Sequence, residues 1–273
     1  MEPLRKVQAL TGTLHLCSAV LFLSLSGEYT VPVSIAGSNF SNVDSPVAGW
    51  AREYEISPPL LVALAAFISA SHHFAAAIFY DFYKSVTYTF AVFRWTDYII
   101  SSSCLVLAAQ VMNGDWALQS LIAAFVLMVC TIMYGATADL NKNSWEGVAF
   151  YLMGWVPFTA VILMQALTLD ASNELNGIPD GVWGLIVYLQ VLFCSFGVVG
   201  GLMHAGLVSP MRAELAYLSL SLTAKTGLQW LLYSATERVG TVAAVASSIS
   251  VAGIAFGIAV FYYTRNMNFY DTH

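Results

Sequence analysis

The stretch ELAYLSLSLTAKTGLQWLLYS, residues 214–234, is an apolar run with a single lysine, Lys225, near its middle. A run of about twenty residues is enough to span a bilayer as a helix. An unpaired ammonium at that depth costs roughly 2.5–3.5 kcal/mol even on the translocon insertion scale. Lys225 lies about ten residues, or about 15 Å of helix, from either end, which is beyond the reach of its side chain. The lysine therefore needs an anion nearby or a covalent modification.

Composition places the chain among polytopic helical membrane proteins, whose partner is the lipid bilayer. Hydrophobic residues make up 58% of the chain and charged residues 10%, with a mean hydropathy of +0.71. Soluble domains contain about 25% charged residues. The net charge of −6 gives no indication of nucleic-acid binding, since the acidic residues lie mostly in predicted loops. The four cysteines lie in apolar segments without metal or redox spacing, so we expect small buried side chains and no metal site.

Eight segments are long and apolar enough to span a membrane, and they are numbered first to eighth in chain order. They cover residues 8–26, 59–81, 88–112, 116–137, 147–168, 182–206, 213–236 and 242–263. The first segment has the layout of a signal peptide, with Arg5 and Lys6 ahead of an apolar core, but His15 inside that core favours a retained helix. The predicted fold class is an all-α polytopic membrane bundle.

The long first loop and the last segment define the predicted domain organisation. Residues 1–240 form one seven-helix unit, and its loop 27–58 is too long for a simple connector. Residues 29–35 alternate like a strand, and Pro32 makes it an edge strand. We therefore expect a small β-rich outer cap that serves as the contact surface of a homodimer. Residues 241–273 add an eighth transmembrane helix and a tail, for which a membrane-surface helix is the alternative.

Basic residues set the predicted orientation in the cell membrane. With the N-terminus in the cytoplasm, the cytoplasmic side holds Arg5, Lys6, Lys84, Lys142, Arg212 and Arg265. The outer side then holds only Arg52 and Arg238, so this orientation follows the positive-inside rule. Eight spans place the C-terminus in the cytoplasm as well.

The third segment supplies a partner for Lys225. Arg94, Asp97 and Ser101 are spaced i, i+3 and i+7, so they share one face of a helix. A carboxylate inside a membrane is as unfavourable as an ammonium, and each charge lowers the free-energy cost of the other when they approach. We therefore expect Asp97 to lie near Lys225.

Other polar residues lie at membrane depth in the first, second and seventh segments. Glu214, Ser221 and Lys225 form a stripe that leads from the cytoplasmic end to the lysine, and Ser221 is placed to hydrogen-bond a group at the lysine nitrogen. The remaining ones are His15, His73 and, four residues before it, Ser69. A buried histidine often serves only packing, but beside a lysine, an aspartate and an arginine we favour a proton-handling role for this pair.

A single lysine near a carboxylate and aromatic side chains suits imine chemistry with an aldehyde. The aromatic residues that could enclose a long apolar polyene between helices are Trp95, Tyr98, Phe158, Phe193, Phe196 and Trp230. If the polyene isomerises in light, the iminium moves relative to Asp97, and a proton can leave for Asp97 or a neighbouring polar cluster. The alternative is a buried Lys225–Asp97 pair that only fixes packing in a transporter or scaffold.

At these residues the sequence resembles a heliorhodopsin, the retinal-binding family whose topology is inverted relative to ordinary microbial rhodopsins. The resemblance covers residues 5–236, and its strongest parts are RWTDY at 94–98, the serines at 101–103 and YLSLSLTAKTGLQW at 217–230. The match to the family is weaker at two further places, which are His15 with Leu16 and Ser69 with His73 and Phe74. The orientation with the N-terminus inside and the long first loop are also features of this family.

The resemblance implies that Lys225 carries all-trans retinal as a protonated Schiff base, with Asp97 as its counterion. It also implies that His15, His73, Ser69 and Ser221 belong to the polar network around that pair. Glu214 matches a family carboxylate on the cytoplasmic side.

The chain departs from the family in having Asp97 where Glu is usual, and in continuing past the seventh helix. Ion-pumping rhodopsins usually carry an aspartate at the position of Ser221. We therefore expect a non-enzymatic light sensor that passes a proton into a closed polar network and signals to a protein partner. A light-driven or light-gated proton transporter, and a non-photoactive scaffold, are the alternatives.

Overall fold

The computed structural model describes residues 3–39, 47–87, 90–142, 144–177 and 180–237. In chain order these contain α1 (Pro3–Leu25), β1 (Val31–Asn39), β2 (Val47–Ile56), α2 (Pro58–Ile78), α3 (Tyr80–Thr87), α4 (Val92–Met112), α5 (Leu118–Leu140), α6 (Trp145–Asn176), α7 (Asp180–His204) and α8 (Pro210–Glu237). The predicted eighth segment, 242–263, lies outside the described residues, as does the domain boundary at 241.

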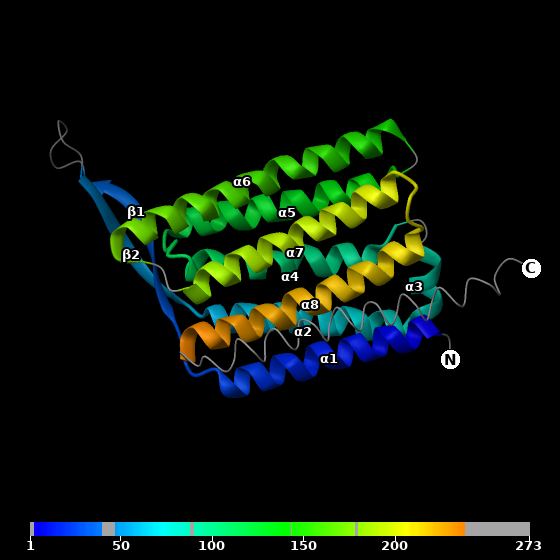
Figure 1. Ribbon diagram of the computed structural model, residues 1–273, viewed down its shortest axis with the longest axis horizontal. Coiled ribbons are helices and arrows are strands. Elements are labelled where there is room, and N and C mark those ends of the chain that lie inside the picture. The colour runs from blue at the N-terminus through cyan, green and yellow to red at the C-terminus, as the bar shows by residue number, and fades with distance from the viewer. Residues whose placement is uncertain (1–2, 40–46, 88–89, 143, 178–179, 238–273) are drawn as a thin grey trace, which may run out of the picture.

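The long helices lie side by side and form a closed ring (Figure 1). Contacts run from α1 to α2, then to α4, α5, α6, α7 and α8, and α8 returns to α1. The first seven predicted segments correspond to these helices, so the predicted seven-helix bundle is confirmed. The short helix α3 is an addition that the hydropathy pattern did not separate from its neighbours.

Helix boundaries follow local sequence signals. Ser57 caps α2, where its hydroxyl accepts a 3.4 Å hydrogen bond from the amide of Leu60, and two prolines follow in the first turn. The helix α6 extends two turns past the predicted end at residue 168 and stops at Gly177, whose φ of 70° favours glycine. Pro157 lies inside α6, as prolines in membrane helices often do.

Five helices of the described chain are individually long and apolar enough to cross a membrane: α1, α2, α5, α6 and α7. The helices α3 and α4 meet the same criterion together, with a bend of 90° between them. The helix α8 is not in this set, although its sequence was predicted to span. It carries Glu214, Lys225 and Gln229, and these side chains are buried in the protein rather than exposed to lipid.

The predicted β-rich loop is an antiparallel hairpin of β1 and β2, which extends from one end of the bundle (Figure 1). Its register joins Val31 to Ile56 at the base. Val31 and Val33 are buried against Val111 and Leu121 of the helices, which anchors the hairpin through apolar contacts.

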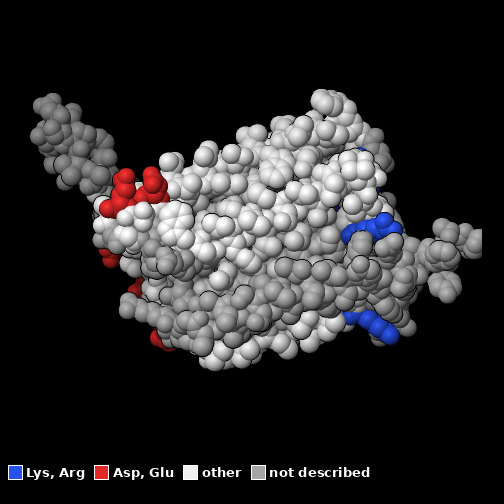
Figure 2. Space-filling view, viewed as in Figure 1, with Lys and Arg blue, Asp and Glu red and all other residues white. Residues whose placement is uncertain are grey.

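Charged side chains gather at opposite ends of the molecule (Figure 2). The end where α1 begins and α5 ends exposes Lys6, Lys84 and Arg212, and the hairpin end exposes Glu28, Glu53, Glu55, Asp170 and Glu174. Exposed leucine, valine and isoleucine side chains cover the surface between them, as expected where lipid contacts the protein. The prediction of four buried cysteines holds for Cys104 but is wrong for Cys17, which is exposed on α1, while Cys130 and Cys194 are only partly buried.

Candidate functional site

Lys225 lies inside the ring, with only 2% of its surface exposed. Its Nζ donates a 2.7 Å hydrogen bond to Ser221 Oγ, one turn earlier on α8. Asp97 Oδ2, on α4, lies 3.8 Å from the same nitrogen. The structure therefore places Asp97 near Lys225, as we expected from the free-energy cost of an unpaired charge inside a membrane.

The carboxylate of Asp97 is held from its other side by α2. Ser69 Oγ donates a 2.6 Å hydrogen bond to Asp97 Oδ1, so each carboxylate oxygen faces a different polar group. Hydrogen bonds to an ionised carboxylate are short and stabilise its charge. Three helices thus converge on this site, with α2 and α8 on either side of Asp97.

The two histidines from α1 and α2 form a stacked pair. The ring centroids of His15 and His73 are 5.3 Å apart and their planes differ by 4°. His73 Nδ1 is 2.8 Å from Gln8 Oε1. Among the described residues, neither ring nitrogen of His15 has a hydrogen-bond partner, and the same holds for His73 Nε2.

A second charged cluster lies nearer the end where α8 begins. Arg94 donates a 2.5 Å hydrogen bond to Glu214 Oε2 and a 3.2 Å hydrogen bond to Asp139 Oδ2. Trp95 Nε1 also donates to Asp139, at 2.9 Å. Arg94 shares a helix face with Asp97, as predicted, but the carboxylates that it binds are on α5 and α8. The cluster is buried, and two anions surround one guanidinium.

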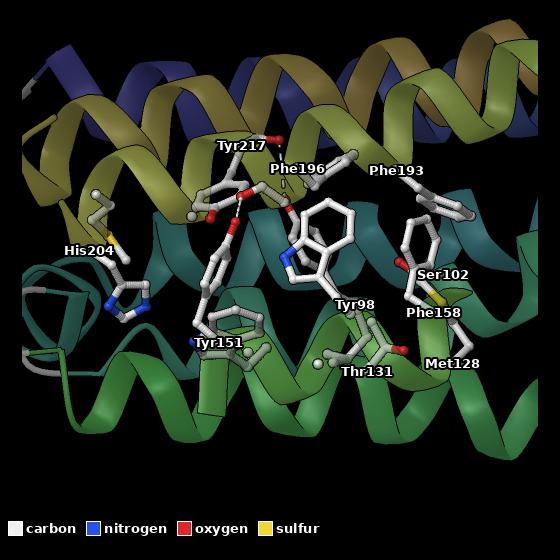
Figure 3. Close-up of a pocket in the computed structure, with 18 residues that line it drawn as sticks. Tyr98, Ser102, Met128, Thr131, Tyr151, Phe158, Phe193, Phe196, His204 and Tyr217 are labelled. Carbon is white, nitrogen blue, oxygen red and sulfur yellow. Dashed lines mark hydrogen bonds between the residues drawn. The ribbon is translucent and has the colours of Figure 1, made fainter. Parts of the chain in front are cut away.

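An apolar cavity lies between α4, α5, α6, α7 and α8, a common place for a ligand site in a helix bundle. Figure 3 shows Phe158, Phe193 and Met128 near one end and Tyr151 and His204 near the other. The remaining lining residues are Trp95, Tyr98, Ser102, Thr131, Ile132, Gly135, Gly154, Trp155, Phe196, Gly197, Gly200, Met203 and Tyr217.

Tyr98 connects the charged pair with this cavity. Its ring lies 5.4 Å from Lys225 Nζ, and the same residue forms part of the cavity wall. Its hydroxyl donates a 3.2 Å hydrogen bond to the carbonyl of Tyr217, which joins α4 to α8. A long apolar group attached at Lys225 would therefore have an apolar cavity beside it. The amine of Lys225, the nearby carboxylate of Asp97 and this cavity together fit retinal.

The structure places five of the six predicted aromatic residues in the wall of the cavity, namely Trp95, Tyr98, Phe158, Phe193 and Phe196. Trp230 does not line it and packs against Tyr233 on α8. Ser101 is buried on α4, and its hydroxyl has no partner among the described residues.

Sequence reasoning missed several residues of the polar network. Gln8, Tyr83 and Asp139 carry no local pattern that distinguishes them from ordinary helix residues, and only their contacts across helices reveal them. His204 was assigned no role, yet it lines the cavity. The described residues contain no group of three or more His, Cys, Asp or Glu side chains suited to a metal ion.

Seven helices around a buried lysine and carboxylate define a membrane protein of the rhodopsin fold, and solved structures share it. The light-driven proton pump LR (Mac) from Leptosphaeria maculans is 14% identical, with a TM-score of 0.66 over 86% of this chain and 96% of that one. The thermophilic rhodopsin from Rubrobacter xylanophilus is 17% identical, with a TM-score of 0.65 over 90% and 99%. The transmembrane domain of the Salpingoeca rosetta rhodopsin phosphodiesterase is 12% identical, with a TM-score of 0.65 over 86% and 85%. These likenesses show the fold alone.

The heliorhodopsin family model matches residues 4–236, so this chain belongs to the heliorhodopsin family. It is therefore a multi-pass membrane protein of the light-responsive, retinal-binding class, as the motifs around Asp97 and Lys225 predicted. No curated protein matches the chain in sequence.

Proposed function

We propose that this protein is a light sensor in which a proton leaves Lys225 Nζ for a closed internal network, and that it signals rather than pumps. The observation that carries this proposal is the buried contact of 3.8 Å between Lys225 Nζ and Asp97 Oδ2, beside an apolar cavity. All-trans retinal, bound covalently through that nitrogen, supplies absorption of visible light and isomerisation. No enzymatic step is part of the proposal.

The residues around Lys225 have distinct tasks. Asp97 is the counterion that keeps the nitrogen protonated in the dark, and Ser69 orients its carboxylate through a 2.6 Å hydrogen bond. Ser221 accepts a hydrogen bond from the nitrogen and fixes its direction. The cavity residues Trp95, Phe193 and Phe196 exclude water from the apolar part of the site.

The proton acceptor in this proposal is the polar network that contains Asp97 and the histidine pair. The imidazoles are buried, and each neutral ring has one unpartnered nitrogen whose lone pair can take a proton. Two imidazolium rings stacked 5.3 Å apart would repel each other, so the pair accommodates one proton rather than two. A proton held by this buried pair stays inside the protein, which favours signalling over transport.

A light-driven or light-gated proton transporter is the second candidate. It is favoured by the hydrogen bonds that continue from His73 through Gln8 and Tyr83 to Glu214, near the end where α8 begins. If that route conducts, a proton can reach one surface of the membrane.

The remaining proposals concern placement and partners. The basic side chains at the end where α1 begins support a cytoplasmic N-terminus in the cell membrane.

The hairpin of β1 and β2 is the proposed contact surface of a homodimer, and the signalling partner is a protein yet to be identified. Light scattering of detergent-solubilised protein tests the dimer, because deletion of residues 31–56 should leave a monomer.

The proposed function is tested by purifying the protein with all-trans retinal and recording absorption across pH. A visible band is expected in the wild type and is lost in Lys225→Ala, whereas Lys84→Ala, at the exposed end, keeps it. A Lys225→Ala variant that retains the band would rule out the linkage. Illumination of oriented vesicles separates the candidates, because a light-dependent current abolished by a protonophore supports transport, and its absence supports signalling.

A further inference from the structure

A continuous hydrogen-bonded chain links the histidine pair to the buried Arg94 cluster. It runs from His73 Nδ1 to Gln8 Oε1 at 2.8 Å, from Gln8 Nε2 to Tyr83 Oη at 2.7 Å, and from Tyr83 Oη to Glu214 Oε1 at 3.1 Å. Every member is buried. One member, Gln8, lacks an ionisable group, and this amide lies between two groups that can exchange protons.

The direction of each hydrogen bond in the chain follows from Glu214. Its carboxylate accepts from Arg94 at 2.5 Å and, as an ionised group, can only accept. Tyr83 must therefore donate its hydroxyl proton to Glu214, so its oxygen accepts from the Gln8 amide nitrogen. The amide oxygen of Gln8 then faces His73, which must donate from Nδ1.

This direction determines the tautomer of His73. With its proton on Nδ1, a neutral His73 presents the lone pair of Nε2, which is buried and unpartnered among the described residues. A proton that reaches His73 can be taken up only at this nitrogen. To continue toward Glu214, the proton on Nδ1 would have to pass to the amide oxygen of Gln8 while the amide nitrogen released another.

We propose that Gln8 is the residue that closes the proton network, because its amide transmits a hydrogen bond but not a proton. This inference rests on the proposed function and supplies the reason why the network signals rather than conducts. A carboxylate at the same position accepts a proton on one oxygen and releases it from the other, so Gln8→Glu should open the route from His73 to Tyr83 and Glu214.

A small cavity borders the chain and is lined by Gln8, His73, Asp97 and Glu214, among other residues. Water in this cavity would offer a route around the amide. The proposal requires that this route does not carry the proton, and the wild-type protein tests that requirement directly.

The experiment uses the full chain with all-trans retinal in vesicles and a soluble pH-indicator dye. After a flash, the wild type should release no proton to the side where α1 begins, whereas Gln8→Glu should. Gln8→Met has a similar length without either hydrogen bond and should release none. If Gln8→Glu does not fold, Gln8→His provides a second proton-passing side chain. Release by the wild type or by Gln8→Met would overturn the proposal.

The double variant Gln8→Glu/Tyr83→Phe tests the path. It lacks the hydroxyl that donates to Glu214, so the release gained by Gln8→Glu should be lost again. Release that persists would show that the proton leaves elsewhere and would overturn the proposed route.

Nitrogen-15 NMR of His73 in the dark measures the tautomer independently of photochemistry. A proton on Nδ1 supports the role of Gln8, and a proton on Nε2 overturns it. If the wild type has no visible band, the proposed function fails, and the tautomer still decides whether Gln8 orients His73.

Discussion

Asp97 Oδ2 lies 3.8 Å from Lys225 Nζ, which is an ion pair but too long for a strong hydrogen bond. The closest polar contact of the lysine is instead Ser221, at 2.7 Å. We therefore expect Asp97, as the proposed counterion, to act on the nitrogen mainly through its charge.

Removal of that charge should make the pigment easier to bleach with alkali. Asp97→Asn takes away the anion that favours the protonated nitrogen, so the bleaching midpoint should fall by about 1–3 pH units. Asp97→Glu should move the midpoint the other way, because the longer side chain closes the gap. Spectral titration measures both, and an unchanged midpoint in Asp97→Asn would place the counterion elsewhere.

Ser69 should stabilise the pigment through Asp97. Ser69→Ala removes the 2.6 Å hydrogen bond and leaves a buried carboxylate oxygen unpaired, at a cost of about 1–3 kcal/mol. Thermal bleaching should therefore occur at lower temperature. Ser71→Ala is the matched control on the same helix, since its exposed hydroxyl only bonds the carbonyl of Phe67. Equal effects of the two substitutions would contradict the role of Ser69.

The histidine pair should act as one proton store. Replacement of either ring by glutamine should slow or reduce light-driven deprotonation of Lys225 Nζ, and the double variant His15→Gln/His73→Gln should do little more than the stronger single one. The reason is that two imidazolium rings stacked 5.3 Å apart would repel each other, so the pair should hold one proton at a time. Time-resolved absorption measures this, and additive effects would indicate two independent acceptors.

Gly197 should control the volume of the cavity. A Cβ at this position would overlap the indole of Trp155, which lines the cavity, so the indole must move. Gly197→Ala should therefore lower the retinal bound per protein or shift the absorption band. Gly184→Ala, on the same helix, meets nothing within 4 Å and is the control. Normal retinal binding by Gly197→Ala would show that Trp155 has room to retreat.

The sequence by itself determined those features that depend on one segment or on the cost of isolated charges. Hydrophobic length defined the seven helices, and alternation within residues 29–35 identified the first strand. Helical spacing placed Ser221 one turn before Lys225, and the cost of unpaired charges in a membrane indicated Asp97 as its partner.

Only the tertiary structure decided which helix faces meet. Arg94 pairs with Asp139 and Glu214 because α5 and α8 bring these carboxylates to it, and no spacing within α4 contains that information. The amide of Gln8 lies between His73 and Tyr83 for the same reason. Contacts within a helix follow from its period of 3.6 residues, whereas contacts between helices depend on the rotation and depth of each helix in the bundle, which packing sets.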